Sequence, residues 1–248
     1  MKIFAYLLYN LVFIFKFNFL KFARNLVWYF SDLIKYNRMG TNKYSVIQLS
    51  NLTPFLGDKT EITELEPIYF LQDIWLIEKV IESKPKKHID IGSSVKTVAI
   101  ISKLLPTIFV DIRPPDIKVD SLSFLSGSIL KLPFKSKSIE SISSMCVLEH
   151  IGLGRYGDKI DPNGSEKAIR EITRFLKPGG NLFVSVPVDK VNQAVFNAHR
   201  TFTRDYFLSL FRDNFRLKEE KYIYGKEFFP KYSKKKGFGT GLFHFQKK

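Results

Sequence analysis

The sequence predicts a doubly wound α/β fold, in which a mostly parallel sheet carries helices on both of its faces. From residue 68 to residue 187, apolar segments of strand length alternate with longer segments whose apolar residues recur at helical spacing. The 248 residues, 45% of them hydrophobic, are enough for one sizeable core. Strands joined by helices of about ten or more residues pair in parallel, which is the reason for choosing this fold class.

The individual elements follow from local patterns along the chain. Val95, Val98 and Ile101 recur every three residues, which indicates a helix after a short apolar strand. Asn163 followed by Glu166 is typical of a capping box at the start of a later helix. The predicted elements are, in chain order, helix 68–83, strand 86–91, helix 94–105, strand 107–111, strand 123–127, strand 138–145, helix 166–177 and strand 181–187.

Two further strands are predicted near the end of the chain, at residues 216–225 and 241–248, with a lysine-rich connection between them. No helical pattern of the length needed for a parallel crossover separates them. We therefore expect an antiparallel pair appended to the parallel sheet.

The first forty residues are apolar and aromatic and differ from the rest of the chain. Their cleanest apolar run, residues 3–15, contains Asn10 and stops at Lys16, whereas a membrane-spanning helix needs about 20 apolar residues. A spanning helix is therefore disfavoured, and the lack of a small-residue cleavage site argues against a removed signal peptide. The predicted organisation is an amphipathic helical extension over 1–40, a linker over 41–65 and the main domain over 66–248.

On a helical projection, the polar and mostly basic residues of this extension gather in one sector, opposite a wide aromatic face. This pattern suits a membrane interface, where cations meet lipid headgroups. We predict a cytoplasmic protein with peripheral contact to the inner face of the membrane through residues 1–36. Packing of the same face on the main domain or on a second subunit remains open, and the oligomeric state is not set by the sequence.

Charge and cysteine content narrow the class of function. The formal net charge of +15 favours polyanionic partners, yet the arginine and aromatic pattern of a nucleic-acid module is missing, so we predict no nucleic-acid partner. The single cysteine, Cys146, cannot form an internal disulfide framework and fits a reducing compartment. Because this cysteine and the four histidines lack zinc-ligand spacing, no metal site is predicted.

The segment HIDIGSS, residues 88–94, is the first candidate ligand loop. From Asp90 to Asp111 is a gap of 21 residues, close to the spacing between a nucleotide loop and an acid that accepts ribose hydroxyls. A dinucleotide loop would read G-x-G-x-x-G, whereas this one reads G-S-S-V-K-T. The missing glycines argue against NAD or FAD and fit a nucleoside ligand without phosphate, such as S-adenosylmethionine. In the alternative reading, Ser93 or Ser94 only caps the next helix.

Several stretches taken together resemble a known superfamily. HIDIGSS, FVDIR, GSILKLPFKSKSIESISSMCVLEHI and REITRFLKPGGNLFVSVP are similar, in order and spacing, to the successive motifs of class I S-adenosylmethionine-dependent methyltransferases. More narrowly, EHIGLGRYGDKIDPNG and VFNAHRTFT resemble a methyltransferase-like family of unknown function. The resemblance covers about residues 66–215. It implies a Rossmann-like, seven-stranded sheet with an antiparallel C-terminal hairpin, and S-adenosyl-L-methionine as cofactor.

The resemblance also implies a cofactor site. Asp90 and Gly92 would hold the methionine moiety and Asp111 the ribose hydroxyls. Ser128 stands where the superfamily commonly has an acid that reads the adenine amino group. The cofactor-binding residues implied in this way are Asp90, Gly92, Ser93, Ser94, Asp111, Ile112, Ser128, Ile129 and Met145.

Methyl transfer needs an acceptor that is positioned and, where required, deprotonated. His150 is the natural base because its unperturbed pKa lies near neutrality. Glu149 would orient it, and Asp158 could serve in its place. The residues predicted to bind the acceptor are Arg155, Tyr156, Asp161, His199 and Arg200.

These residues predict an S-adenosylmethionine-dependent methyltransferase of unknown acceptor, which could be a small molecule, a glycan or a lipid-linked precursor at the membrane face. Three rival hypotheses stay open. The first is a catalytically degenerate, methyltransferase-like binding or scaffold protein, and the second is an NAD-dependent oxidoreductase. The third is a membrane-interaction protein whose function resides in residues 1–40.

Overall fold

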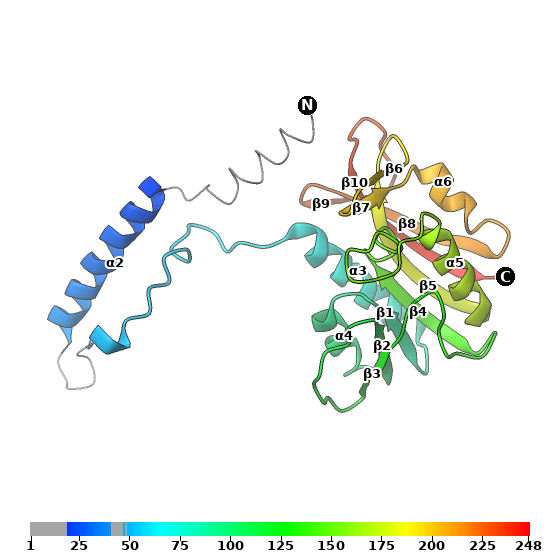
Figure 1. Cartoon of the computed structure of the whole chain (residues 1–248), viewed down its shortest axis with the longest axis horizontal. Helices are drawn as coiled ribbons and strands as arrows, with labels where there is room; N and C mark the ends of the chain where they lie inside the picture. The colour runs from blue at the N-terminus through cyan, green and yellow to red at the C-terminus, as the bar shows by residue number, and fades with distance from the viewer. Residues whose placement is uncertain (1–18, 41–46, 48) are drawn as a thin grey trace. The chain divides into compact units, whose positions relative to one another are not determined.

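The computed structural model describes residues 19–40, 47 and 49–248, and its internal contacts divide the chain into two units, Met1–Glu64 and Leu65–Lys248 (Figure 1). The expectations for residues 1–18, 41–46 and 48 lie outside the described residues.

The second unit is built on one eight-stranded sheet with the strand order β3-β2-β1-β4-β5-β10-β8-β9 (Figure 1). The strands from β3 to β5 pair in parallel, whereas β10 pairs antiparallel with both β5 and β8. Beyond the seven predicted strands, the short β9 adds an eighth at the edge. The mostly parallel sheet and the antiparallel C-terminal hairpin are confirmed. The strands span β1 His88–Ile91, β2 Thr107–Asp111, β3 Leu122–Ser126, β4 Ile139–Met145, β5 Leu176–Val188, β8 Phe215–Tyr224, β9 Glu227–Phe229 and β10 Gly239–Lys247.

Helices cover both faces of this sheet. Successive side chains of a strand point to opposite faces, so each face has apolar side chains for a helix layer to bury. On one face, α3 (Pro67–Ser83) and α4 (Val95–Ile101) pack with Phe183 of β5. On the other face, α5 (Gly164–Phe175) and α6 (Arg204–Ser209) pack with the neighbouring Val184. All of these apolar contacts are buried, so the sheet is fixed between two layers and its carboxyl-end loops are held in place.

Some local expectations differ from the structure. The capping box at Asn163 is wrong: the Asn163 side chain caps nothing, and Glu166 instead accepts a hydrogen bond from the Tyr206 hydroxyl, with 2.6 Å between the oxygens. The hairpin of β6 (Gln193–Val195) and β7 (His199–Thr201) was not predicted, because its strands are too short to show an apolar alternation.

The first unit contains α2 (Phe19–Met39) and the short 3-10 helix η1 (Leu49–Asn51). The polar side of α2 faces its own linker, since Asn25 donates to the Leu56 carbonyl and Asp32 pairs with Lys59. None of the helices in residues 19–40 and 49–248 is long and apolar enough to cross a membrane.

Candidate functional site

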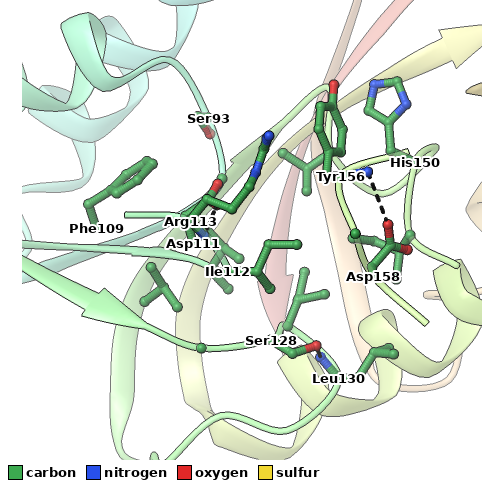
Figure 2. A pocket seen from close by; sticks show the side chains of 18 of the residues that line it. Ser93, Phe109, Asp111, Ile112, Arg113, Ser128, Leu130, His150, Tyr156 and Asp158 are labelled. Atoms are coloured by element: carbon green, nitrogen blue, oxygen red, sulfur yellow. Dashed lines mark hydrogen bonds between the residues drawn. The ribbon is translucent and has the colours of Figure 1, made fainter. Parts of the chain in front are cut away.

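A cavity of about 680 Å³ opens at the carboxyl ends of β1, β2 and β4, which is where ligands collect in open α/β sheets (Figure 2). The loops after these three strands supply most of its wall. The sequence-predicted residues that line it are Gly92, Ser93, Asp111, Ile112, Ser128, Ile129, His150, Tyr156 and Asp158.

The remaining predicted residues do not line this cavity: Asp90, Ser94, Met145, Glu149, Arg155, Asp161, His199 and Arg200. Conversely, the cavity includes Arg113 and Lys159 and the apolar side chains of Phe109 and Leu130, to which the sequence assigned no role. The only feature of the sequence that could have pointed to these four residues is that they lie close to the ends of predicted strands.

The loop after β1 turns sharply at Gly92, whose φ of +70° favours glycine. A Cβ atom at this position would lie 3.3 Å from both methyl groups of Val147 and 3.6 Å from Oδ2 of Asp111. A side chain at this position would therefore crowd Val147 and Asp111, and the Gly92 backbone itself forms part of the cavity wall.

Asp90 supports this loop from inside the protein, rather than contacting the cavity as predicted. Its fully buried carboxylate accepts a hydrogen bond from the Ser93 amide, 3.0 Å from N to Oδ1, and a second from the Ser143 hydroxyl. Ser93 Oγ in turn accepts from the Met145 amide at 2.9 Å. Burial raises the pKa of Asp90 to about 6, so the carboxylate is charged at neutral pH and holds the loop by charge-assisted hydrogen bonds.

His88 continues this buried network on the far side of Ser143. Its Nε2 and the Ser143 hydroxyl are 2.8 Å apart, and its Nδ1 lies 2.8 Å from the Ser141 hydroxyl. Because the single Ser143 proton goes to Asp90, Nε2 of His88 must donate to Ser143 and Nδ1 must accept from Ser141. Burial lowers the pKa of His88 to about 3, which keeps the ring neutral.

Asp111 ends β2, lines the cavity (Figure 2) and lies next to the Gly92 backbone. Its Oδ1 accepts the Arg113 amide at 2.7 Å, and no described residue donates a hydrogen bond to Oδ2. This oxygen is free to accept from a ligand hydroxyl. Ile112 and Ile129 supply apolar wall on the same side, and Ser128 Oγ accepts weakly from the Leu130 amide at 3.3 Å.

His150 stands at the other end of the cavity (Figure 2). Its Nδ1 lies 2.8 Å from the Ala198 carbonyl, which can only accept, so the proton sits on Nδ1 and Nε2 carries a lone pair. Burial lowers the pKa of His150 to about 4, so the ring is neutral at pH 7. The low pKa also makes His150 a weaker base than an ordinary histidine.

Glu149 does not orient His150 as predicted. Its Oε1 is 3.8 Å from Nε2 of His150, which is too far for a hydrogen bond. The side chain is buried, and burial raises the pKa of Glu149 to about 8, so the carboxyl is mostly protonated at neutral pH. The Ala198 carbonyl holds the imidazole instead.

Two predicted acceptor-binding residues have other partners. Arg200 donates to the carbonyl oxygens of Ile151, Asp161 and Pro162 at 2.6, 3.2 and 3.3 Å. Asp161 pairs with Lys167 and accepts from the Asn163 amide. Both residues therefore hold the loop between β4 and α5 in shape. Asp158, which lines the cavity, likewise accepts the Gly152 amide at 2.6 Å.

Tyr156 lies beside His150, with 5.4 Å between the ring centroids. The guanidinium carbons of Arg113 and Arg155 are 4.6 and 5.1 Å from the centroid of the Tyr156 ring. His199 lies away from the cavity wall and contacts Phe238, 5.9 Å from centroid to centroid. The cavity thus has an apolar end near Ile112 and a polar, basic end near His150.

Comparison with known proteins agrees with this architecture. Residues 131–216 match a family described as "Caenorhabditis protein of unknown function, DUF268". No curated protein matches the chain in sequence.

Solved structures with the same fold cover most of the chain. The [4+2]-cyclase SpnF is 14% identical, with a TM-score of 0.53 over 72% of this chain and 81% of its own. The 1,6-didemethyltoxoflavin-N1-methyltransferase of Burkholderia thailandensis, which holds S-adenosylhomocysteine, is 14% identical, with a TM-score of 0.51 over 76% and 93%. The geranyl diphosphate C-methyltransferase of Streptomyces coelicolor is 10% identical, with a TM-score of 0.50 over 71% and 77%.

The chain therefore has the fold of class I S-adenosylmethionine-dependent methyltransferases, as the sequence motifs predicted. A cyclase shares this fold, so the reaction has to be argued from the site.

Proposed function

We propose that the chain is an S-adenosylmethionine-dependent methyltransferase. The observation that carries this proposal is that the Gly92 backbone and Asp111 lie side by side in the cavity wall, and that Oδ2 of Asp111 has no protein donor among the described residues. A ribose hydroxyl is a suitable donor for that oxygen, and the apolar wall at Ile112 and Ile129 suits an adenine ring. The 680 Å³ volume lies within the usual range for a small-molecule site.

The residues at the other end of the cavity fit the needs of methyl transfer. S-adenosylmethionine supplies a methyl group that its sulfonium activates. His150 would take the proton of the acceptor on Nε2, while the Ala198 carbonyl holds the imidazole in the required tautomer. Apart from this proton transfer, the role of the protein would be to position the acceptor beside the methyl group.

Calorimetric titration tests the proposal and its rivals. We expect the full chain to bind S-adenosylmethionine and S-adenosylhomocysteine more tightly than NAD, since the Gly92 loop lacks the second and third glycines of a pyrophosphate cradle. Stronger binding of NAD would favour the oxidoreductase. If neither S-adenosylmethionine nor S-adenosylhomocysteine bound at millimolar concentration, the methyltransferase would be contradicted. Binding without methyl transfer to any acceptor would favour the scaffold alternative.

We further propose that α2 holds the protein at a membrane surface, where a glycan or lipid-linked acceptor would be presented. Apolar side chains of one sector of the helix are exposed, with Leu20, Val27 and Ile34 at 81%, 71% and 51%. Arg24 and Lys35 flank this sector, and the one acid of the helix, Asp32, is paired with Lys59. An exposed apolar stripe beside basic residues is the pattern of an interfacial helix.

Vesicle sedimentation measures this proposed contact. The full chain should bind vesicles containing phosphatidylglycerol, and Val27→Asp should lower the partition coefficient at least about tenfold, because burying one valine contributes about 1.5 kcal/mol. Ile62→Asp is the matched control, since Ile62 is 70% exposed in the same unit but lies outside α2. Equal binding of wild type and Val27→Asp would contradict the membrane role.

A further inference from the structure

Two arginines from different loops contact one aromatic ring, that of Tyr156, and of the two Arg113 lines the cavity whereas Arg155 does not. Arg113 follows β2, Arg155 lies in the loop after β4, and the guanidinium carbons are 4.6 and 5.1 Å from the centroid of the Tyr156 ring. Figure 2 shows the Arg113 side chain extending from beside Asp111 toward Tyr156, with His150 on the other side of that ring. The two cations are thus gathered next to the proposed base.

Most of the hydrogen-bonding capacity of these two guanidinium groups is unused. Within residues 19–40, 47 and 49–248, neither group has a carboxylate within 4.0 Å, and the Arg113 guanidinium donates no hydrogen bond. Arg155 donates one, from Nη1 to the Ala198 carbonyl at 2.9 Å. Each guanidinium has five N–H donors, and a cation–π contact at an exposed site contributes only about 0.5–1 kcal/mol. Both groups therefore remain available to a ligand.

The charged side chains of the cavity wall are the cations Arg113 and Lys159 and the acids Asp111 and Asp158. The nearest acid in the same loop, Asp158, already accepts the backbone amides of Gly152 and Tyr156. Burial lowers the pKa of both His150 and His199, and the positive charge of Arg155 lowers both further.

We infer that the methyl acceptor carries an oxyanion, a carboxylate or a phosphate, which Arg113 and Arg155 bind beside Tyr156. Guanidinium groups match these oxyanions with paired N–H donors. The Tyr156 and His150 ring centroids are 5.4 Å apart, so the oxyanion sits close to the nucleophile that His150 would deprotonate. The statement that the bound anion belongs to the methyl acceptor rests on the proposed function. The anion site itself rests only on the positions of the two arginines beside Tyr156.

Calorimetric titrations with two simple probes test the site and distinguish its two chemistries. Inorganic pyrophosphate represents a phosphate ligand and citrate a carboxylate ligand, each added at fixed ionic strength to the full chain, with and without S-adenosylhomocysteine. We expect at least one probe to bind, and Arg113→Gln and Arg155→Gln each to weaken that binding about tenfold, because a hydrogen bond to a charged group is worth about 1.5 kcal/mol or more.

Arg170→Gln is the control for the loss of one positive charge, since Arg170 is exposed on α5 and does not line the cavity. It should bind the probe within twofold of wild type. Failure of both probes to bind would overturn the inference, as would either arginine variant binding like wild type or all three variants losing affinity equally. S-adenosylhomocysteine binding, read in the same experiment, reports on the proposed function separately from the anion site.

Discussion

Asp111→Ala should weaken the binding of S-adenosylhomocysteine at least about 100-fold. A carboxylate that accepts hydrogen bonds from two ribose hydroxyls contributes about 1.5 kcal/mol or more for each, and every 1.4 kcal/mol is a factor of ten. Oδ2 of Asp111 has no donor among the described residues, and the protein hydrogen bond lost with the carboxylate is the one from the Arg113 amide to Oδ1. The measurement is a calorimetric dissociation constant.

Asp116→Ala is the matched control for Asp111→Ala. Asp116 is exposed in the same loop and does not line the cavity, so its removal changes the net charge equally without touching the proposed ribose site. Its dissociation constant should stay within twofold of wild type. If Asp111→Ala, still folded by circular dichroism, bound S-adenosylhomocysteine as tightly as wild type, the cofactor would have to sit elsewhere.

Gly152→Ala should lower the free energy of unfolding by about 2–5 kcal/mol. Gly152 has a φ of +83°, and a Cβ atom there would lie 2.0 Å from the Asp161 carbonyl oxygen. The left-handed backbone costs a residue with a side chain about 1–2 kcal/mol, and overpacking against backbone adds about 1–3 kcal/mol. The comparison is made by urea denaturation.

Gly157→Ala separates these two causes. Gly157 has a similar φ of +88°, but a Cβ atom there would meet nothing within 4 Å. Its expected cost is the backbone contribution alone, about 1–2 kcal/mol. Equal destabilisation by the two variants would mean that the loop moves to accommodate the added methyl group, and that Gly152 and Asp161 are not held together as tightly as the structure has them.

The fold was predictable because it depends on local patterns. The alternation of apolar residues places Phe183 and Val184 on opposite faces of β5, and the helix spacing of α3 and α5 matches the faces they bury. The gap from Asp90 to Asp111 likewise follows from one βαβ unit, so both acids were found from the sequence.

The roles of individual side chains were less predictable because their partners are distant in sequence. Arg200 was assigned to an acceptor, yet its donors go to the carbonyl of Ile151, 49 residues away, and to those of Asp161 and Pro162. Backbone carbonyls leave no trace in the residue types, so no motif could show this use. Arg113 was assigned no role because its partner, the Tyr156 ring, lies in another loop that is distant in sequence.

The Ala198 carbonyl, which accepts from both His150 and Arg155, has a consequence for how this protein can vary. A backbone oxygen is present whatever side chain the residue carries, so substitution at position 198 leaves the orienting group in place. What must be kept is the path of the chain through the β6–β7 turn. Relatives with other residues at this position can thus hold the imidazole of His150 in the same orientation.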